Sequence, residues 1–580
     1  MNNQKNKIKK QIVENLELNF GKLEEKDKAL LEKAFEWVET YHLNQKRLTG
    51  ESFINHPLRV ALTLSLMKLD INSVIGGLLH DIIEDGGVEL TSLKKNFNEE
   101  IAFLVQGVTK ISSLNYKETF SDEEAENFRN MILSMSKDLR VILIKLADRL
   151  DNLKTLWVLD KKTQKIKALQ TLEILAPIAY RLGLTKIGAQ LEDLSFPYAY
   201  PQEYKLTKTL SGKRQKELEN YLKKIVPLIE KELKDNNLKP INIKYRAKHL
   251  YSIWRKLQKE DMDITRIYDL VAIRIIFQTV EECYSALGVI HQYYKPVPNR
   301  FKDYIALPKP NGYRSLHTTV FTKEGKVLEI QIRTKEMDEE AEWGIAGHWF
   351  YQLLKNSKIY KKRKEFQIPR HLNWLNQIKK WKDSFSTSRD FLEAVKIDFF
   401  KNRIFVLTPR GDIIDLPEGA TPIDFAYQIH SEIGNHTIGA KANGKIVPLD
   451  YKLQSGEVVE IITQKNKLPS PSWLEFVKMT DTKKKIQQTL KKTKILPLQL
   501  KKNFICRLEI LAENKVGLLD LVSNLIAKQN INIIELNGKT IRNKALLTFK
   551  LKVKYFSHLE TLLKNLKQLK EIKEIKVDYR

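Results

Sequence analysis

The sequence predicts a multidomain protein of the α + α/β class, and three observations support this prediction. The chain has 580 residues, more than one hydrophobic core normally organises, so several domains are expected. Its 42% hydrophobic and 29% charged residues are typical of globular proteins, and no stretch approaches the roughly 18 consecutive apolar residues of a membrane span. Long segments with helical periodicity are followed by segments that combine helices with short β-rich runs.

The N-terminal part is expected to be entirely helical. Residues 1–195 carry apolar residues at helical spacing with few turn signals, as in AENFRNMILSMSKDLRVILIKLADRL. Residues 196–355 mix helical segments with β-rich runs such as LVAIRIIF and VLEIQIR, which predicts an α/β unit built on a sheet. The basic stretch 356–401 is expected to form a helical linker.

The C-terminal part is expected to hold two small domains. In residues 402–463, short strands are separated by turn signals such as PRGD and PEG, which predicts a small α/β module. Residues 464–502 are expected to form a short helical linker. Residues 503–580 have the pattern of a βαββαβ unit, because FICRLEILAE and LLTFKLKVK alternate apolar with polar residues and GLLDLVSNLIAKQN has the spacing of an amphipathic helix.

The charge balance is strongly basic. Lysine and arginine outnumber aspartate and glutamate by 99 to 71, a net charge of +28. This surplus favours polyanionic partners such as nucleotides or RNA, although the solvated faces of a lysine-rich protein would give the same balance. The first residues contain no apolar export signal, so the cytoplasm is the expected compartment. Cys283 and Cys506 stand far apart and predict neither a disulfide framework nor a zinc site.

The stretch LLHDIIEDGG, residues 78–87, places a histidine and several carboxylates among apolar residues. On a helix, His80 and Glu84 would be four residues apart, and so would Asp81 and Asp85, which would give two adjacent polar columns. A histidine beside an aspartate can supply two ligands to a divalent cation, and a further carboxylate can orient or deprotonate a water molecule. A solvated acidic face at the end of a helix explains the stretch equally well.

Two further segments carry residues of the same ligand types. His56 lies in INHPLRVA, and Asp148 follows an apolar run and precedes Asn152 by four positions. A lone histidine or aspartate is more often satisfied within a core. Taken together, His56, His80, Asp81 and Asp148 form a set of two imidazoles and two carboxylates, which suits Mn²⁺ or another first-row cation better than a thiolate site would.

In their order along the chain, these motifs resemble a known family. RLTGESFINHPLRVA, GLLHDIIED and GVTKI are similar to the HD hydrolase domain of the Rel/Spo stringent-response proteins, which make and destroy the alarmone (p)ppGpp. YRAKHLYSIWRKLQK, IYDLVAIRIIF, NGYRSLHTTVF and EIQIRT are similar to the synthetase domain of that family. The resemblance implies a mixed-sheet, nucleotidyltransferase-like fold for the second domain. It extends to a TGS-like module at 402–463 and an ACT-like domain at 503–580.

For the hydrolase, the resemblance implies a role for each matching position. His56, His80, Asp81 and Asp148 match Mn²⁺ ligands. Glu84 and Asp85 match the acidic pair that activates water for removal of the 3′-pyrophosphate. Asp151 stands where the family usually has histidine. The positions matching the nucleotide pocket are Arg47, Thr49, Asn152 and Thr155.

For the synthetase, the resemblance implies transfer of pyrophosphate from ATP to a ribose 3′-hydroxyl. Asp269 and Glu329 match Mg²⁺ ligands, and Glu329 also matches the group that receives the hydroxyl proton. Tyr313 matches an aromatic residue that stacks on the acceptor guanine, and His317 and Arg300 belong to the same loop region. Without this context, Tyr313 could be an ordinary turn residue. The positions matching ATP-phosphate binders are Arg246, Lys248, Ser252 and Lys256.

Three of these ATP-site positions have a regular spacing. Lys248, Ser252 and Lys256 stand at i, i+4 and i+8, which places them on one face if the segment is a helix. An ordinary basic helix face would show the same spacing.

The TGS-like module implies contact with RNA. His430, in AYQIHSEIG, matches a histidine implicated in gripping uncharged tRNA on a ribosome, and a buried histidine that closes a small sheet is the open alternative. The expected partners are therefore ATP, GDP or GTP and (p)ppGpp, with uncharged tRNA and the ribosome through the TGS-like and ACT-like domains. No membrane partner is expected, and an oligomer is compatible with the sequence.

The resulting hypothesis is a cytoplasmic bifunctional enzyme. One activity is that of a GTP pyrophosphokinase with Mg²⁺, and the other is that of a guanosine-3′,5′-bis(diphosphate) 3′-diphosphatase with Mn²⁺. Two alternatives remain open. The first is a hydrolase-dominant enzyme with a weak synthetase, and the second is a ribosome- or tRNA-binding starvation sensor with residual catalysis.

Overall fold

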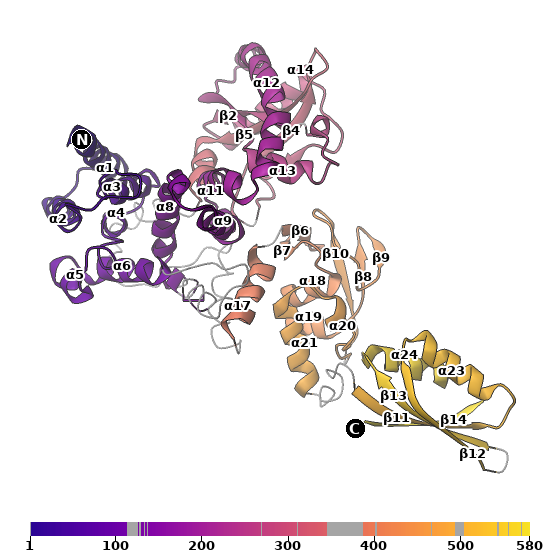
Figure 1. Ribbon diagram of the computed structural model, residues 1–580. Helices are drawn as coiled ribbons and strands as arrows, with labels where there is room; N and C mark the ends of the chain where they lie inside the picture. The colour runs from indigo at the N-terminus through magenta and orange to yellow at the C-terminus, as the bar shows by residue number, and fades with distance from the viewer. Residues whose placement is uncertain are drawn as a thin grey trace. The chain divides into compact units, whose positions relative to one another are not determined.

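The computed structural model divides the chain into two compact units, Met1–Lys401 and Asn402–Arg580 (Figure 1). Among the helices that the structure describes, none is long and apolar enough to span a membrane. The described residues are 2–112, 126, 129–130, 132, 134–135, 137–267, 269–309, 311–344, 387–400, 403–465, 467–492, 504–541, 544–554, 556–569 and 571–579.

The first part of the first unit is helical, as predicted. Helix α8 is buried on nearly all sides, because its apolar residues, among them Ile144, meet α3, α4, α6 and α11. A helix that is apolar almost all round belongs in a core. The helical elements are α1 (Asn2–Phe20), α2 (Glu25–Tyr41), α3 (Asn55–Leu66), α4 (Ile71–Leu78), α5 (Leu90–Asn96), α6 (Glu99–Ser112), α8 (Arg140–Lys154), η1 (Leu156–Val158), α9 (Lys161–Gln170), η2 (Thr171–Leu175), α10 (Ala176–Arg181) and α11 (Thr185–Ala199).

The predicted helix through residues 78–87 is wrong, because α4 ends at Leu78 and consecutive turns follow. Nδ1 of His80 lies 2.9 Å from the carbonyl oxygen of Gly77. The side chain therefore contacts the oxygen that would accept a backbone hydrogen bond if the helix continued. Gly77 also brings α4 close to α3, since a Cβ there would lie 2.3 Å from a methyl carbon of Leu64. The two predicted polar columns therefore do not form.

The second part of the first unit is an α/β domain with a five-stranded mixed sheet. The strand order is β1-β2-β5-β4-β3, in which β2 and β5 are parallel and the other pairs are antiparallel. The mixed sheet that the resemblance implies is thus confirmed, and Figure 1 shows it beside α12, α13 and α14. The elements are α12 (Pro201–Asp235), β1 (Asn242–Ala247), α13 (Leu250–Leu257), η3 (Ile264–Arg266), β2 (Val271–Phe277), α14 (Val280–Tyr293), β3 (Lys302–Asp303), β4 (Leu316–Phe321) and β5 (Val327–Thr334).

The chain then returns to the helical part. Helix α17 (Ser388–Val395) and the π-helical turn η5 (Lys396–Phe400) place Phe391 and Leu392 in the same hydrophobic core as the N-terminal helices. Most of the predicted linker 356–401 lies outside the described residues. Helix α11 runs through the predicted boundary at 195/196, and the domain boundaries as such stay predictions.

The second unit begins with a small α/β module followed by two helices. A hairpin of β6 and β7 accompanies a three-stranded antiparallel sheet of order β10-β8-β9. The buried Asp424 caps α18 and also accepts hydrogen bonds from the backbone N–H groups of Lys478 and Met479, both at 2.9 Å. The elements are β6 (Arg403–Leu407), β7 (Ile413–Pro417), α18 (Pro422–Ile429), α19 (Ser431–Asn435), β8 (Thr437–Ala442), β9 (Lys445–Val447), β10 (Val459–Thr463), α20 (Trp473–Phe476) and α21 (Thr480–Lys492).

The second unit ends with the predicted βαββαβ domain. Its antiparallel sheet has the order β12-β13-β11-β14. The predicted alternation is confirmed, because Leu508 on β11 and Phe549 and Leu551 on β13 are fully buried. The elements are β11 (Phe504–Glu513), α23 (Leu518–Lys528), β12 (Asn532–Ile541), β13 (Lys544–Val553), α24 (Phe556–Lys567) and β14 (Ile572–Tyr579).

Candidate active sites

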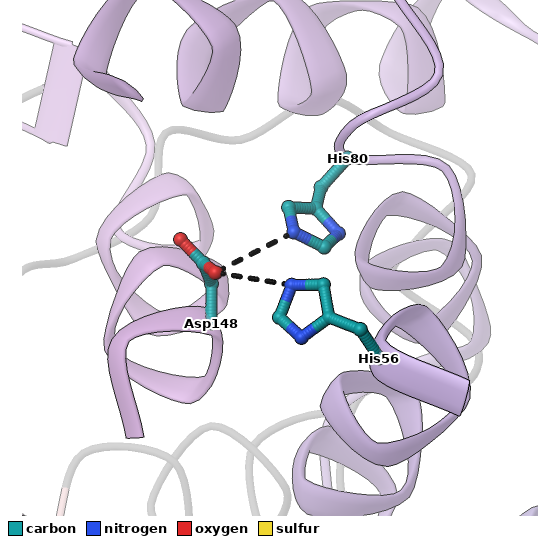
Figure 2. A group of neighbouring side chains, drawn as sticks. All are labelled: His56, His80 and Asp148. Atoms are coloured by element: carbon teal, nitrogen blue, oxygen red, sulfur yellow. Dashed lines mark ion pairs between the residues drawn. The ribbon is translucent and has the colours of Figure 1, made fainter. Parts of the chain in front are cut away.

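In the helical part, three segments far apart in sequence bring two histidines and two aspartates together. His56 lies on α3, His80 follows α4 and Asp148 lies on α8, and Figure 2 shows these three side chains pointing toward one another. One ligand atom from each of the three lies within 4.8 Å of the others. Nε2 of His56 lies 3.3 Å, and Nε2 of His80 3.6 Å, from Oδ1 of Asp148. Asp81 joins the group, with Oδ2 at 3.1 Å from Nε2 of His80.

These residues fit a divalent cation. Nε2 of His80 is buried and has no hydrogen-bond partner among the described residues, although carboxylate oxygens surround it. Burial alone would lower the pKa of His80, but Asp81 and Asp148 outweigh it and raise the pKa to about 10. The cluster therefore favours a positive charge at its centre, and two imidazoles with two carboxylates are the ligands that first-row cations accept.

A cavity of about 500 Å³ opens beside this cluster. Glu84 and Asp85 stand at its wall, and partial burial raises the pKa of both carboxyl groups. All four residues predicted for the nucleotide pocket line the same cavity. The structure therefore brings the predicted hydrolase residues together at one place. The ring centroid of His80 lies 5.1 Å from that of His56, and the residues that line the cavity are Arg47, Thr49, His56, Asp81, Glu84, Asp85, Asp148, Asn152 and Thr155.

Four cations in this cavity were not predicted from the sequence: Lys46, Lys145, Arg149 and Lys167. Nζ of Lys145 lies 2.7 Å from Oδ2 of Asp148. Lys145 precedes Asp148 by one helical turn, so the i, i+3 spacing was the available signal. Such cations suit a ligand that carries several phosphates.

Asp151 also contacts the cluster. Its Oδ2 lies 2.8 Å from Nδ1 of His56, and Nε of Arg59 donates to its Oδ1 at 2.8 Å. Burial raises the pKa of Asp151, but the contacts with His56 and Arg59 outweigh it and hold the pKa well below its usual range. Asp151 is therefore a buried anion in contact with His56, one of the candidate cation ligands.

In the α/β domain, two lysines converge on one carboxylate. Nζ of Lys248 and Nζ of Lys256 both lie 2.5 Å from Oδ2 of Asp269. Burial raises the pKa of Asp269, but the two ammonium groups outweigh it and lower the pKa. The other oxygen of Asp269 is buried and has no hydrogen-bond partner among the described residues. This arrangement suits a cation and the phosphates of a nucleotide.

The predicted helical spacing of these residues is wrong for Lys248. Helix α13 begins at Leu250, and His249 before it has an extended backbone. The N–H of Lys248 donates to the carbonyl oxygen of Leu270 at 2.8 Å, which holds the residue beside the sheet rather than on the helix. Ser252 lies on α13, and its Oγ is 2.6 Å from Nε2 of His249. Arg246 lies on β1, where it lines a cavity of about 540 Å³ together with Arg274.

The residues predicted to bind the acceptor form a hydrogen-bonded chain. Nδ1 of His317 lies 3.2 Å from Oε1 of Glu329, and the hydroxyl of Tyr313 lies 2.7 Å from Nε2 of His317. Burial lowers the pKa of His317. Burial raises the pKa of Glu329, but hydrogen bonds from His317 and Gln331 outweigh it and lower the pKa. Arg300 is exposed in the loop before β3.

Other residues around Tyr313 were missed by the sequence reasoning. Nζ of Lys309 lies 4.9 Å from the ring centroid of Tyr313, and burial lowers the pKa of Lys309 to about 8. The guanidinium of the buried Arg333 lies 5.6 Å from the same centroid and pairs with Asp338. Lys309 lies in PKPNG, a turn signal directly before Tyr313, so the sequence placed this lysine near the predicted site. Arg333 lies in EIQIRT, where the apolar alternation predicts a strand and does not indicate a cation at the site.

His430 does not close a sheet. Its side chain is exposed, and Nδ1 accepts a hydrogen bond from the N–H of Glu432 at 3.3 Å, which caps α19. The alternative of a buried histidine is therefore wrong, and the contact with RNA stays a prediction.

Comparison with known families agrees with this domain order. Residues 34–185 match the family described as HD domain, and residues 245–356 match the "Region found in RelA / SpoT proteins". Residues 404–463 match the TGS domain and residues 500–576 the ACT domain. The predicted kinds of domain are thereby confirmed, and an HD domain implies a divalent cation, in agreement with the histidine and aspartate cluster.

Curated relatives match over most of this chain. It is 47% identical over 466 residues to the guanosine-3′,5′-bis(diphosphate) 3′-pyrophosphohydrolase of Aquifex aeolicus (strain VF5), a match that covers 80% of this chain and 64% of that protein. The GTP pyrophosphokinase of Myxococcus xanthus is 45% identical over 467 residues, with 80% and 61% covered. The bifunctional (p)ppGpp synthase/hydrolase SpoT of Escherichia coli (strain K12) is 41% identical over 453 residues, with 78% and 63% covered. The matches thus span less than two thirds of these relatives.

Proposed function

Because this chain belongs to the Rel/Spo family, we propose that it is a bifunctional alarmone enzyme. One site transfers pyrophosphate from ATP to the 3′-hydroxyl of GDP or GTP and releases AMP. The other hydrolyses (p)ppGpp to GDP or GTP and pyrophosphate. The observation that carries the proposal is that one chain holds two separate clusters, one around His56 and Asp148 and the other around Asp269 and Glu329, each with the residue types that its reaction needs.

At the first site, His56, His80, Asp81 and Asp148 would hold Mn²⁺. When bound, Mn²⁺ polarises a phosphoryl oxygen and acidifies water. One carboxylate of the pair Glu84 and Asp85 takes the proton of the attacking water, a role for which a raised carboxyl pKa is suitable. Water attacks the phosphorus next to the 3′-oxygen, the bond between them breaks, and the carboxyl group that took the proton of the water gives a proton to the departing 3′-oxygen. Lys145, Arg149 and Lys167 balance the charge of the phosphates.

At the second site, Asp269 and Glu329 would hold Mg²⁺, which neutralises charge on the triphosphate when bound. Lys248 and Lys256 bind the phosphates of ATP, and Tyr313 stacks on the acceptor guanine. The acceptor 3′-oxygen attacks the β-phosphorus of ATP, the bond from that phosphorus to the α,β-bridging oxygen breaks, and AMP leaves. Glu329 receives the proton of the hydroxyl, and His317 holds that carboxylate in place.

The C-terminal unit would adjust the balance between the two reactions. TGS and ACT domains follow the catalytic part, and the exposed His430 is available for contact with uncharged tRNA on a ribosome. The net charge of +28 favours such a polyanionic partner. Since ATP and guanine nucleotides are the substrates, the cytoplasm is the compartment that we propose.

To test this proposal, purified protein is incubated with ATP, GDP and Mg²⁺, and Mn²⁺ is added afterwards. The amounts of AMP, ppGpp and pyrophosphate are followed by ion-exchange chromatography. Accumulation of ppGpp with Mg²⁺, followed by its loss with Mn²⁺, is the expected result. If ppGpp never forms but added ppGpp is hydrolysed, the chain is a hydrolase with an inactive synthetase. If neither reaction occurs and tRNA binds in a strongly salt-dependent manner, the sensor alternative replaces the proposal.

A further inference from the structure

We propose that Asp151 is a positioning residue of the hydrolase site, which fixes His56 for cation binding and, through the same carboxylate oxygen, holds Arg47 at the nucleotide pocket. This inference rests on the proposed hydrolase function. It concerns a residue outside the proposed set of cation ligands, which contacts His56 and Arg47 and would fix the orientation of both.

The contact with Asp151 orients the imidazole of His56. Asp151 follows Asp148 by about one turn of α8, and its Oδ2 lies 2.8 Å from Nδ1 of His56. The carboxylate favours the tautomer in which Nδ1 carries the hydrogen, so that Nε2 would offer its lone pair to a bound cation. Nε2 is the atom that faces the cluster, 3.3 Å from Oδ1 of Asp148 and 3.5 Å from Oδ2 of Asp81.

His80 is also held through Nδ1, but by a different acceptor. Nδ1 of His80 lies 2.9 Å from the carbonyl oxygen of Gly77, which leaves Nε2 of His80 toward the cluster. Both imidazoles are thus held through Nδ1 and present Nε2 inward (Figure 2). Only His56 has a charged acceptor, and a carboxylate behind a ligating imidazole raises the basicity of that ligand.

The carboxylate of Asp151 is itself held in place. Arg59 grips it with two hydrogen bonds, from Nε to Oδ1 at 2.8 Å and from Nη2 to Oδ2 at 3.0 Å. Arg59 is in turn held by Glu51, whose Oε1 lies 2.6 Å from Nη2. Asp151 is only 2% exposed. The carboxylate of Asp151 therefore cannot turn away from His56 without breaking its two hydrogen bonds with Arg59.

Asp151 also contacts a residue of the nucleotide pocket. Nη1 of Arg47 lies 3.4 Å from Oδ2 of Asp151, and Nη2 of Arg47 donates to Oδ1 of Asn152. Oδ2 of Asp151 thus contacts a candidate cation ligand and a candidate nucleotide ligand at once. Loss of its charge should weaken the binding of both the cation and the nucleotide.

The test compares Asp151→Asn with a matched control, Asp138→Asn. Asp138 also grips an arginine, with Oδ2 at 2.7 Å from Nη2 of Arg140, but no hydrogen bond joins it to His56, His80, Asp81 or Asp148 in the described part of the chain. Binding of Mn²⁺ to the full chain is measured by electron paramagnetic resonance of the free ion. Asp151→Asn should weaken Mn²⁺ binding about 10- to 100-fold and raise the KM for ppGpp. Asp138→Asn should leave the Kd for Mn²⁺ unchanged.

Two further variants separate the possible failures. Arg47→Gln should raise the KM for ppGpp without changing the Kd for Mn²⁺, because it removes only the nucleotide side of the contact. His80→Ala should weaken Mn²⁺ binding if the cation site is where we propose it. If His80→Ala weakens binding but Asp151→Asn does not, the role of Asp151 is overturned while the proposed function stands. If His80→Ala leaves binding unchanged, the proposed cation site itself fails.

A variant that keeps the charge covers the case in which Asp151→Asn does not fold. Asp151→Glu moves the carboxylate by one methylene, so it should weaken Mn²⁺ binding several-fold and less than the amide does. Binding of Mn²⁺ by Asp151→Glu with the affinity of the wild type, at an unchanged circular dichroism spectrum, would overturn the proposal.

Discussion

Nδ1 of His317 lies 3.2 Å from Oε1 of Glu329, across the antiparallel strands β4 and β5. The other ring nitrogen lies 2.7 Å from the hydroxyl of Tyr313. Burial lowers the pKa of His317, so its imidazole is neutral near pH 7, with one donor nitrogen for the carboxylate and one acceptor for the phenol. A single chain of hydrogen bonds thus joins the residue proposed to stack on guanine to the carboxylate proposed to receive the proton.

Substitution of Tyr313 should separate stacking from hydrogen bonding. Tyr313→Ala removes the ring and should raise the KM for GDP by about tenfold or more, since stacking on an aromatic ring contributes ~1–3 kcal/mol per base. Tyr313→Phe keeps the ring and loses only the hydrogen bond to His317, so its KM should change much less. Initial rates of AMP release over a range of GDP concentrations measure both. Equal KM values for the two variants would show that the ring does not stack.

The rate of synthesis should fall above about pH 8, because burial lowers the pKa of Lys309 to about 8. Below this pH the ammonium group is charged and attracts the phosphates of the acceptor, and above it the charge is lost. The value of kcat/KM for GDP at saturating ATP, measured from pH 7 to 10, should therefore decline. In Lys309→Arg the guanidinium stays charged, so the decline should be smaller. An identical decline in both proteins would assign it to another group.

The parts of the fold that could be predicted are those with strong local periodicity. Leu547, Phe549 and Leu551 alternate with polar residues, and a strand of period two follows directly. The same reasoning failed at His80, because its side chain competes with the backbone for the carbonyl of Gly77, and helical spacing does not reveal such competition. It failed at Lys248 because a backbone hydrogen bond to Leu270 holds this residue outside the helix.

For the candidate sites, residue types were predictable and their surroundings were not. His56 and Asp148 could be proposed as ligands from their chemistry and from resemblance. The contact between His56 and Asp151 joins residues 95 positions apart, which no local pattern encodes. Phe391 lies in a segment whose basic composition predicted a linker, yet its side chain is buried in the core of the N-terminal helices. This burial could not be predicted, because it depends on how the distant segments of the chain fold together.

Asp424 should be essential to the stability of the TGS domain. It is fully buried and accepts hydrogen bonds from the N–H and hydroxyl of Thr421 and from the N–H groups of Lys478 and Met479, all at 2.9 Å. Asp424→Ala leaves these donors unsatisfied and should cost about 3 kcal/mol or more. Hydrogen exchange of peptides from this domain measures the loss. Asp412→Ala, which removes an exposed carboxylate, serves as the control and should change exchange little.

Gly344 should be intolerant of any side chain. A Cβ there would lie 2.4 Å from the carbonyl carbon of Gly183 and from the carbonyl oxygen of Leu182, and the backbone φ is +51°. Gly183 and Gly344 line the same cavity as Tyr313, so Gly344→Ala should raise the KM for GDP. The control is Gly212→Ala on α12, where a Cβ meets nothing within 4 Å and the KM should not change. An unaltered KM in Gly344→Ala would mean that the cavity does not hold the acceptor.

The central claim is that two separate sites catalyse opposite reactions, and the double comparison of His80→Ala with Glu329→Gln tests it most directly. Both variants are assayed for ppGpp formation from ATP and GDP with Mg²⁺ and for ppGpp hydrolysis with Mn²⁺, with wild type alongside. His80→Ala should lose hydrolysis and keep synthesis, whereas Glu329→Gln should lose synthesis and keep hydrolysis. Loss of both reactions in either variant, at an unchanged circular dichroism spectrum, would contradict the assignment of two independent sites.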